Sequence, residues 1–167
     1  MICQNCNAQL DDNATFCTNC GTTQATTQAQ PQYFRPALQL NTSRSLCKMF
    51  FLSLITFGIY GIVNYSRMAD EINIVASRYD GKKTAPYFVM LILTCYTMGI
   101  FAFVWMHNFA NRIGNEARRR GYATDFGAKD FWLWNILGGL IIVGPFIYLH
   151  KLTKNMNMIN ESYNYYG

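Results

Sequence analysis

Three long uncharged stretches dominate the pattern of hydrophobic and polar positions in this 167-residue chain. They cover residues 49–66, 84–106 and 131–149, and none contains an acidic or basic side chain. A bilayer core about 30 Å thick needs about 20 helical residues, so each stretch is close to spanning length. Helices at the surface of a soluble protein would carry charges on their exposed faces. The pattern therefore predicts an all-α membrane domain. Its three hydrophobic helical segments are expected near residues 46–66, 86–106 and 131–150.

A glycine with an aromatic residue two positions later recurs in each stretch. Gly58, Gly99 and Gly144 carry this internal repeat, at spacings of 41 and 45 residues. Only 12 residues, 46–57, separate the start of the first segment from Gly58, which is about 18 Å of helix. The helix therefore either continues through the glycine and crosses the bilayer, or breaks there and returns. We expect three crossings with the N-terminus in the cytoplasm, because a returning backbone is harder to satisfy in lipid.

These glycines are also expected to be joints between helices, either as hinges or as points of close helix packing. Gly144 is followed by Pro145, which predicts a kink because proline removes one helical hydrogen bond. The predicted joint residues are Gly58, Gly61, Gly99, Gly144 and Pro145.

Amphipathic sequence follows each uncharged stretch. The apolar positions of these parts share one helical face, and we expect the helices to lie in the headgroup layer. Three faces follow from this spacing: Met68, Ile72 and Val75; Phe109, Ile113 and Ala117; Leu152, Met156 and Ile159. Water would then contact the charged side chains of Arg67, Asp70, Arg112 and Lys154. The densest basic cluster, Arg118, Arg119 and Arg120, is expected to contact anionic lipid headgroups.

Two Cys-x-x-Cys pairs begin the chain. Cys3 and Cys6 form the first pair, and Cys17 and Cys20 form the second, with ten residues between the pairs. Two such knuckles bring four thiolates to one point, the ligand set of a structural zinc site. Gly21, and Asn7 at the matching position of the first knuckle, suit the positive φ that such turns require. Residues 1–21 are therefore predicted to be a small β zinc ribbon, with iron as the alternative metal.

Disulfides are the alternative use of these cysteines, but no export signal precedes them and an oxidising compartment is not indicated. Residues 1–34 contain no Lys or Arg, so the ribbon is not expected to bind nucleic acid phosphates. The net charge of +5 therefore belongs to the rest of the chain. Residues 22–43 are rich in Thr, Gln, Ala and Pro, which predicts a flexible linker between the ribbon and a membrane domain over 44–167.

The uncharged segments resemble a known family. The motifs that carry the resemblance are 58–61 (Gly-Ile-Tyr-Gly), 111–116, 131–134 (Phe-Trp-Leu-Trp) and 141–148. They are similar to a bacterial family of small multi-helix membrane proteins, catalogued as a domain of unknown function that often follows an N-terminal zinc ribbon. The resemblance covers nearly the whole chain outside the linker. It implies a bacterial inner-membrane location and no established activity.

No enzymatic arrangement is evident, because the sequence holds no nucleophile–base set, phosphate loop or paired carboxylates. The uncharged stretches lack the ionisable groups that a coupled transporter needs. We therefore expect a non-enzymatic adaptor that presents its cytoplasmic ribbon, with structural zinc, to a protein partner. The alternative is an oligomeric pore or transport component with Asn64 and Asn135 along its path. Membrane lipid is the other expected partner, and homo-oligomers are compatible with either hypothesis.

Overall fold

Two compact units make up the chain, Met1–Tyr33 and Phe34–Gly167. The computed structural model describes residues 2–3, 5–11, 16–22 and 36–167. Most of the predicted linker, residues 23–35, lies outside the described residues.

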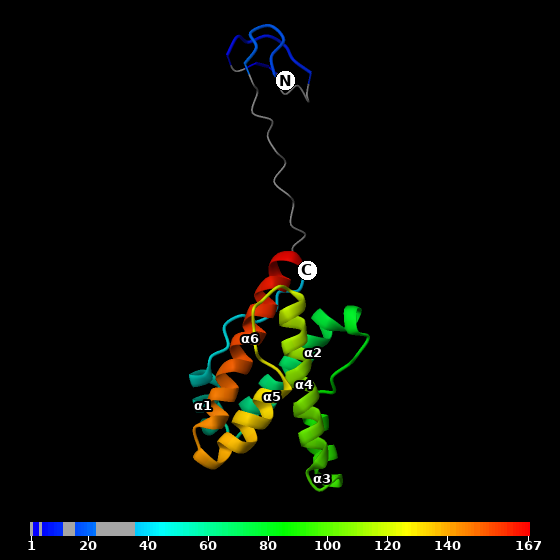
Figure 1. Cartoon of the computed structure of the whole chain (residues 1–167), viewed down its shortest axis with the longest axis vertical. Coiled ribbons are helices and arrows are strands. Elements are labelled where there is room, and N and C mark those ends of the chain that lie inside the picture. Colours follow the sequence, from blue (N-terminus) through cyan, green and yellow to red (C-terminus); the bar gives the residue numbers. More distant parts are fainter. Residues whose placement is uncertain (1, 4, 12–15, 23–35) are drawn as a thin grey trace. The chain divides into compact units, whose positions relative to one another are not determined.

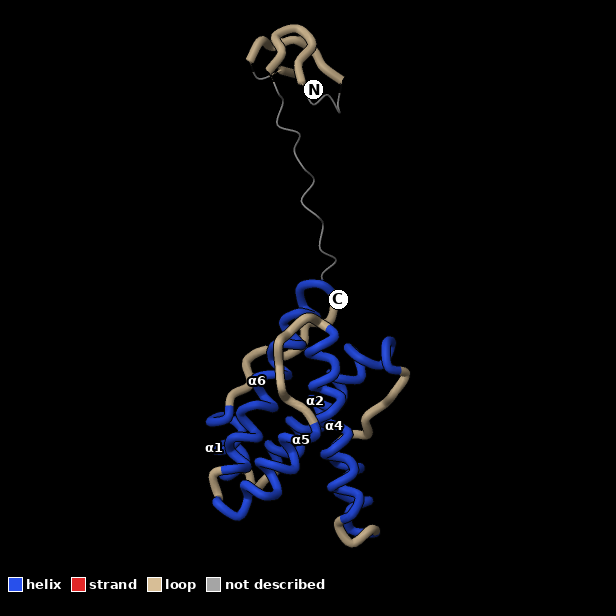
Figure 2. Tube along the Cα trace, viewed as in Figure 1, coloured by secondary structure: helices blue, strands red, loops and turns tan. Residues whose placement is uncertain are grey.

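The helical unit consists of helices joined by short turns and by two longer loops, 81–86 and 120–127 (Figures 1 and 2). In chain order these are α1 (Leu46–Ile55), α2 (Ile59–Asp80), α3 (Tyr87–Tyr96), α4 (Ile100–Arg119), α5 (Ala128–Asp130), the π-helix η1 (Phe131–Leu137), the 3₁₀ helix η2 (Gly138–Ile141) and α6 (Gly144–Tyr166). The side chain of Ser45 caps α1 by accepting a hydrogen bond from the Lys48 amide. Gly81, with φ of 65°, ends α2 in the left-handed conformation that glycine tolerates.

Each uncharged stretch is interrupted: one or two short elements end inside it, and a longer helix begins and turns back against them. α1 packs against α2, α3 packs against α4, and η1 and η2 pack against α6. The prediction of three membrane-spanning segments is therefore wrong: among the described residues, no helix has both the length and the apolar character needed to cross a bilayer. Of the two paths that the sequence left open at Gly58, the chain takes the one that breaks and returns.

The apolar faces of α2, α4 and α6 form a protein core. Their central residues are completely buried, and they are the nine residues predicted to face a headgroup layer: Met68, Ile72, Val75, Phe109, Ile113, Ala117, Leu152, Met156 and Ile159. The sequence located these faces correctly but assigned them the wrong neighbour. Because three amphipathic helices can bury their apolar faces against one another, none of them needs lipid for that purpose.

A segment before α1 lies along α6. Asn164 exchanges two hydrogen bonds with the backbone of Leu40, at 2.7 and 2.8 Å, and Asn157 exchanges two with the backbone of Arg44. Between them, Asn160 donates to the carbonyl oxygen of Asn41 and to Glu71. The end of the predicted linker, residues 36–43, therefore belongs to the helical unit, and the ladder of asparagines on α6 holds it there.

Candidate functional site

The four paired cysteines bring their sulfur atoms together. All four Sγ atoms lie within 4.8 Å of one another, and Cys3–Cys20 and Cys6–Cys17 are each 3.6 Å apart. Tetrahedral zinc with Zn–S bonds of about 2.3 Å requires sulfur atoms about 3.8 Å apart. The observed separations fit that geometry and are much longer than a disulfide bond of about 2 Å.

The backbone of the two knuckles explains this convergence. Asn7 and Gly21 have φ of 55° and 68°, so both positions adopt the left-handed conformation that the sequence predicted. Their amides donate to the carbonyl oxygens of Cys3 and Cys17, at 3.0 and 2.8 Å. An antiparallel bridge between Ile2 and Gln9 closes the first turn. The predicted β ribbon is therefore present in the described residues as two matching turns with isolated bridge positions at Ile2, Gln9 and Phe16.

The thiols of Cys20 and Cys17 have different environments. The hydroxyl and backbone of Thr22 lower the pKa of Cys20 to about 6, because they stabilise its thiolate. Burial raises the pKa of Cys17 to about 11. A bound cation would supply the opposing charge that a buried thiolate needs. The donor set of four thiolates therefore fits zinc in a structural role, with Cys3, Cys6, Cys17 and Cys20 as its ligands.

A second feature is the turn that joins α1 to α2, which closely matches the turn that joins α3 to α4. Gly58 and Gly99 have φ of 88° and 94°, which explains why glycine occupies the centre of both turns. The hydroxyl of Thr56 donates to the carbonyl oxygen of Leu52 at 2.6 Å and accepts from the amide of Tyr60 at 3.0 Å. Thr97 forms the equivalent pair of bonds in the other turn, to Leu93 and Phe101.

The remaining predicted joint residues have different environments. Gly61 faces Ser53 across the α1–α2 contact, where a Cβ atom would lie 3.0 Å from the serine hydroxyl. A Cβ atom on Gly144 would overlap the backbone of Trp134 and Gly138, so Gly144 is a point of close packing. Pro145 is near the first position of α6, where proline is well tolerated. The expected kink is therefore replaced by the start of a new helix.

The ends of these turned-back elements expose apolar side chains. Phe57 and Met98 are 98% and 95% exposed, and Leu140 is 86% exposed. Aromatic contacts connect the elements of the three stretches. Phe50 of α1 contacts Phe146 of α6, and Phe103 of α4 stacks on Trp132 of η1. In Figure 1 the α3–α4 turn and the segment leading into α6 lie at one end of the helical unit, opposite the C-terminus. We call the exposed apolar residues of 50–63, 88–104 and 132–143 the apolar end.

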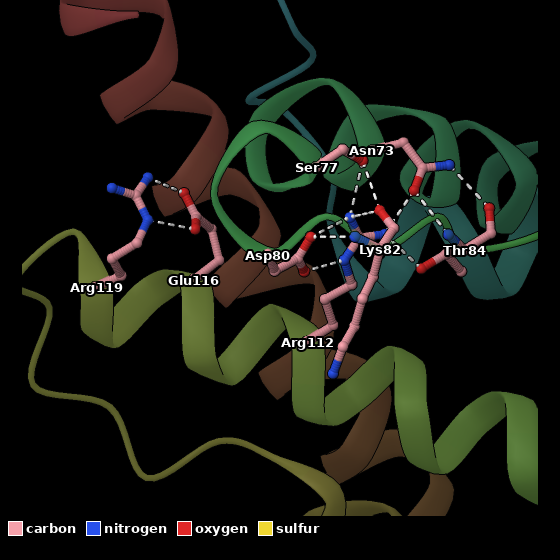
Figure 3. Close-up of polar contacts among 8 residues, drawn as sticks. All are labelled: Asn73, Ser77, Asp80, Lys82, Thr84, Arg112, Glu116 and Arg119. Carbon is pink, nitrogen blue, oxygen red and sulfur yellow. Dashed lines mark hydrogen bonds and ion pairs between the residues drawn. The ribbon is translucent and has the colours of Figure 1, made fainter.

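Arg112 is the centre of a polar cluster at the end of α2 (Figure 3). Its guanidinium donates to Asp80 through Nε at 2.7 Å and through Nη2 at 3.1 Å. It also donates to the side chains of Asn73, Ser77 and Thr84. A last bond reaches the carbonyl oxygen of Lys82. Arg112 therefore fixes the loop between α2 and α3 against α4. The expectation that Arg112 faces water is wrong, whereas Arg67, Asp70 and Lys154 are exposed as predicted.

Asp80 has a lowered pKa in this cluster. Burial by itself raises the pKa, but the hydrogen bond and positive charge of Arg112 and the amide of Lys82 outweigh it. The carboxylate is therefore ionised well below neutral pH, and the Arg112–Asp80 ion pair persists through the physiological range.

The predicted basic cluster makes contacts within the protein. Arg119 and Arg120 both form ion pairs with Glu116, and Arg119 also lies over the ring of Tyr79, 3.6 Å from its centroid. Arg118 donates to the carbonyl oxygens of Thr124 and Phe126. About 30 Å of helix separates these arginines from Gly99, because α4 has 20 residues. Their contacts within the protein and their distance from the α3–α4 turn do not support the predicted contact with lipid headgroups.

Two parts of the chain match known protein families. Residues 44–115 match a domain of unknown function, DUF4234, and residues 2–23 match a zinc-ribbon domain. The combination agrees with the predicted fusion of a ribbon to a family of unknown function. Neither the curated proteins nor the solved structures contain a match. The ribbon match and the sulfur geometry together identify a zinc-ribbon site.

Proposed function

We propose that this protein is an adaptor on the cytoplasmic face of a bacterial inner membrane. The helical unit docks on the bilayer through its apolar end without crossing it, and the zinc ribbon binds a protein partner. The observation that carries the proposal is the apolar end itself, in which side chains as large as Phe57 and Met98 are almost fully exposed.

The chemistry of the apolar end supports a lipid surface as its partner. Exposed apolar patches beyond a few hundred Å² are rare on soluble monomers and mark interaction sites. The three stretches contribute this surface without any acidic or basic side chain. Tyr96 and Trp132 are exposed on it, and such aromatic side chains favour the boundary between headgroups and acyl chains. A protein docked in this way would insert its turns to a depth of about 5–10 Å.

Two features of the ribbon support an adaptor role. The site offers four cysteine ligands, so a bound zinc would have no open position for a substrate. Ile2 and Phe16 are 67% and 56% exposed, which provides apolar contact area for a protein partner. A zinc–thiolate site is also suited to a reducing compartment, in agreement with a cytoplasmic ribbon.

Flotation of the zinc-loaded, full-length protein with phosphatidylcholine vesicles tests the docking. We expect the protein to float, and a Phe57→Asp/Met98→Asp variant to remain at the bottom of the gradient. Phe57 and Met98 have φ near 50°, which Asp tolerates better than most residues, so this variant adds charge without added backbone strain. Burial of either side chain contributes about 1.5–3 kcal/mol, so vesicle affinity should fall at least about tenfold.

Ile74→Asp is the matched control, because Ile74 is an exposed apolar residue of α2 about 22 Å of helix beyond the turn. Equal flotation of the wild type and the Phe57→Asp/Met98→Asp variant would refute docking through the turns. Side-specific labelling of single cysteines placed at Lys83 and Gly167 tests the non-crossing arrangement. Both positions should react from the cytoplasmic side only, and labelling from opposite sides would refute it.

The adaptor role is tested by crosslinking in cells. Cys3→Ser/Cys17→Ser should lose ribbon-dependent partner capture while membrane association stays at the wild-type level. Capture that survives loss of the zinc site would contradict a partner-binding ribbon.

A further inference from the structure

A pocket of about 690 Å³ opens between α4 and the loop that joins α2 to α3. This size lies within the usual range for small-molecule sites. One face of α4 lines it, at the three- and four-residue spacing of a helix, and the loop residues 82–85 form the opposite wall.

The lining changes character along α4. Near the apolar end it consists of Phe101, Val104 and Trp105. Farther along the helix, Asn108, Asn111 and Asn115 replace these apolar residues. A ligand that fills the pocket must therefore be apolar at one end and polar at the other, which describes an amphiphile.

The charges of the lining favour an anionic polar end, because four basic side chains face two carboxylates. Asp80 and Glu116 are the two carboxylates, and each forms an ion pair with an arginine of the pocket wall. Lys82 and Lys83 remain. Within the described residues 36–167, neither lysine ammonium group has a hydrogen-bond or ion-pair partner, and none is drawn for Lys82 in Figure 3. Both lysines are exposed, and the ammonium charge of Lys82 acts on Asp80 without a direct contact. Two ammonium groups without a direct partner, beside a row of amides, suit a phosphate group with neighbouring hydroxyl or ester oxygens.

We infer that this pocket binds one anionic phospholipid molecule. Its phosphate lies at Lys82 and Lys83, its glycerol oxygens face the asparagines of α4, and its acyl chains run past Phe101 and Val104 towards the apolar end. The inference rests on the proposed function to the extent that the bilayer supplies the lipid. Binding itself requires only the pocket.

Arg112 is a positioning residue for this site. All of its hydrogen bonds are directed to the end of α2 and to the loop, including 2.6 Å to the Lys82 carbonyl oxygen and 2.8 Å to the Thr84 hydroxyl. It therefore holds the lysine-bearing loop at the wall of the pocket and leaves the lysine ammonium groups available.

Titration calorimetry on the zinc-loaded, full-length protein tests the inference with three probes. These are monomeric dihexanoyl phosphatidylglycerol, dihexanoyl phosphatidylcholine and inorganic phosphate. We expect the phosphatidylglycerol to bind at one site per chain, with phosphatidylcholine and phosphate each at least about tenfold weaker. Equal binding of phosphatidylcholine would overturn the anionic selectivity. Equal binding of inorganic phosphate would assign the site to a soluble anion and overturn the lipid.

Substitution of the lysines locates the site. Lys82→Glu/Lys83→Glu should weaken phosphatidylglycerol binding at least tenfold, whereas Lys129→Glu, which changes an exposed lysine outside the pocket, should leave it unchanged. Unchanged binding by the double variant would overturn the inference. Val104→Asp should weaken binding of the lipid but not of phosphate, and equal effects on both probes would contradict the assigned acyl path.

The outcomes separate this inference from the proposed docking. The double lysine variant should still float with phosphatidylcholine vesicles, because docking depends on the apolar end. The Phe57→Asp/Met98→Asp variant should still bind monomeric phosphatidylglycerol. Each proposal can therefore be refuted without refuting the other.

Discussion

Arg112 and Asp80 form a two-point ion pair across 32 residues of sequence, with Nε and Nη2 of the guanidinium each bonded to a different carboxylate oxygen. The Arg112 side chain is 7% exposed and that of Asp80 is 30% exposed. The arginine is thus the buried partner, and it has further polar contacts on α2 and the following loop. The Arg112 side chain therefore joins α4 both to α2 and to the loop that follows α2.

Arg112→Met should lower the free energy of unfolding of the helical unit by about 2 kcal/mol, because it leaves several part-buried polar groups without their donor. Arg112→Lys should cost less but still about 1.5 kcal/mol, since an ammonium group cannot reproduce the planar fork. Denaturant unfolding followed by helical circular dichroism measures both. Arg67→Met, at an exposed position, is the control and should change stability by no more than about 0.5 kcal/mol.

The Asp80 pKa predicts a contribution to acid unfolding. Because its folded-state pKa is lowered, the carboxylate stabilises the fold fully above its ordinary pKa, and this contribution is lost as the pH falls through the lowered folded value. Unfolding free energies between pH 2 and 5 should therefore decrease less steeply in Asp80→Asn than in the wild type. Identical slopes in the two proteins would show that Asp80 does not contribute.

Gly114 lies where α4 crosses the loop before α5, and a Cβ atom there would overlap the carbonyl oxygen of Phe126. Gly114→Ala should therefore lower stability by about 3 kcal/mol, at the upper end for overpacking, because backbone cannot move aside as a side chain can. Gly139→Ala is the matched control, since no atom lies within 4 Å of the corresponding Cβ position. Thermal unfolding of both variants under one condition makes the comparison, and similar midpoints would contradict it.

Zinc removal should unfold only the ribbon. Its described residues contribute only isolated bridges and no helix, so the four metal bonds supply most of its stability. After chelation, the amide resonances of residues 2–22 should lose their dispersion, while helical circular dichroism should stay within a few per cent of its initial value. Metal analysis should find about one zinc per chain beforehand. Loss of helical signal on chelation would show that the two units are thermodynamically coupled.

The ribbon could be predicted well because its information is local. Cysteines three residues apart determine a knuckle, and Gly21 and Asn7 mark the left-handed positions that follow. The family comparison and the sulfur geometry agree with that interpretation.

The turns show where sequence reasoning reached its limit. Uncharged runs of 18 to 23 residues meet the length criterion for a span, and periodicity cannot show whether a helix ends inside such a run. The signal for ending was nevertheless present. Thr56 and Thr97 each stand two residues before a glycine, and their hydroxyls cap the turns that the glycines permit.

The Arg112 cluster was missed because its partners lie 28 to 39 residues away. One signal could have indicated it. Asn73, Ser77 and Asp80 recur at four- and three-residue spacing, which places three hydrogen-bonding side chains on one face of α2 beside the apolar face. A polar row next to a core-facing stripe often pairs with a partner on a neighbouring helix.

The asparagine ladder on α6 has a mechanical consequence for the segment before α1. Its bonds to the backbone of residues 40, 41 and 44 come from Asn164, Asn160 and Asn157 in that order. A pull on the chain before Leu40 therefore acts first on the hydrogen bonds of Asn164. It then reaches those of Asn160 and last those of Asn157, so the bonds break one after another. Residues 40–44 can therefore detach from α6 in steps while the apolar faces of α2, α4 and α6 stay packed together.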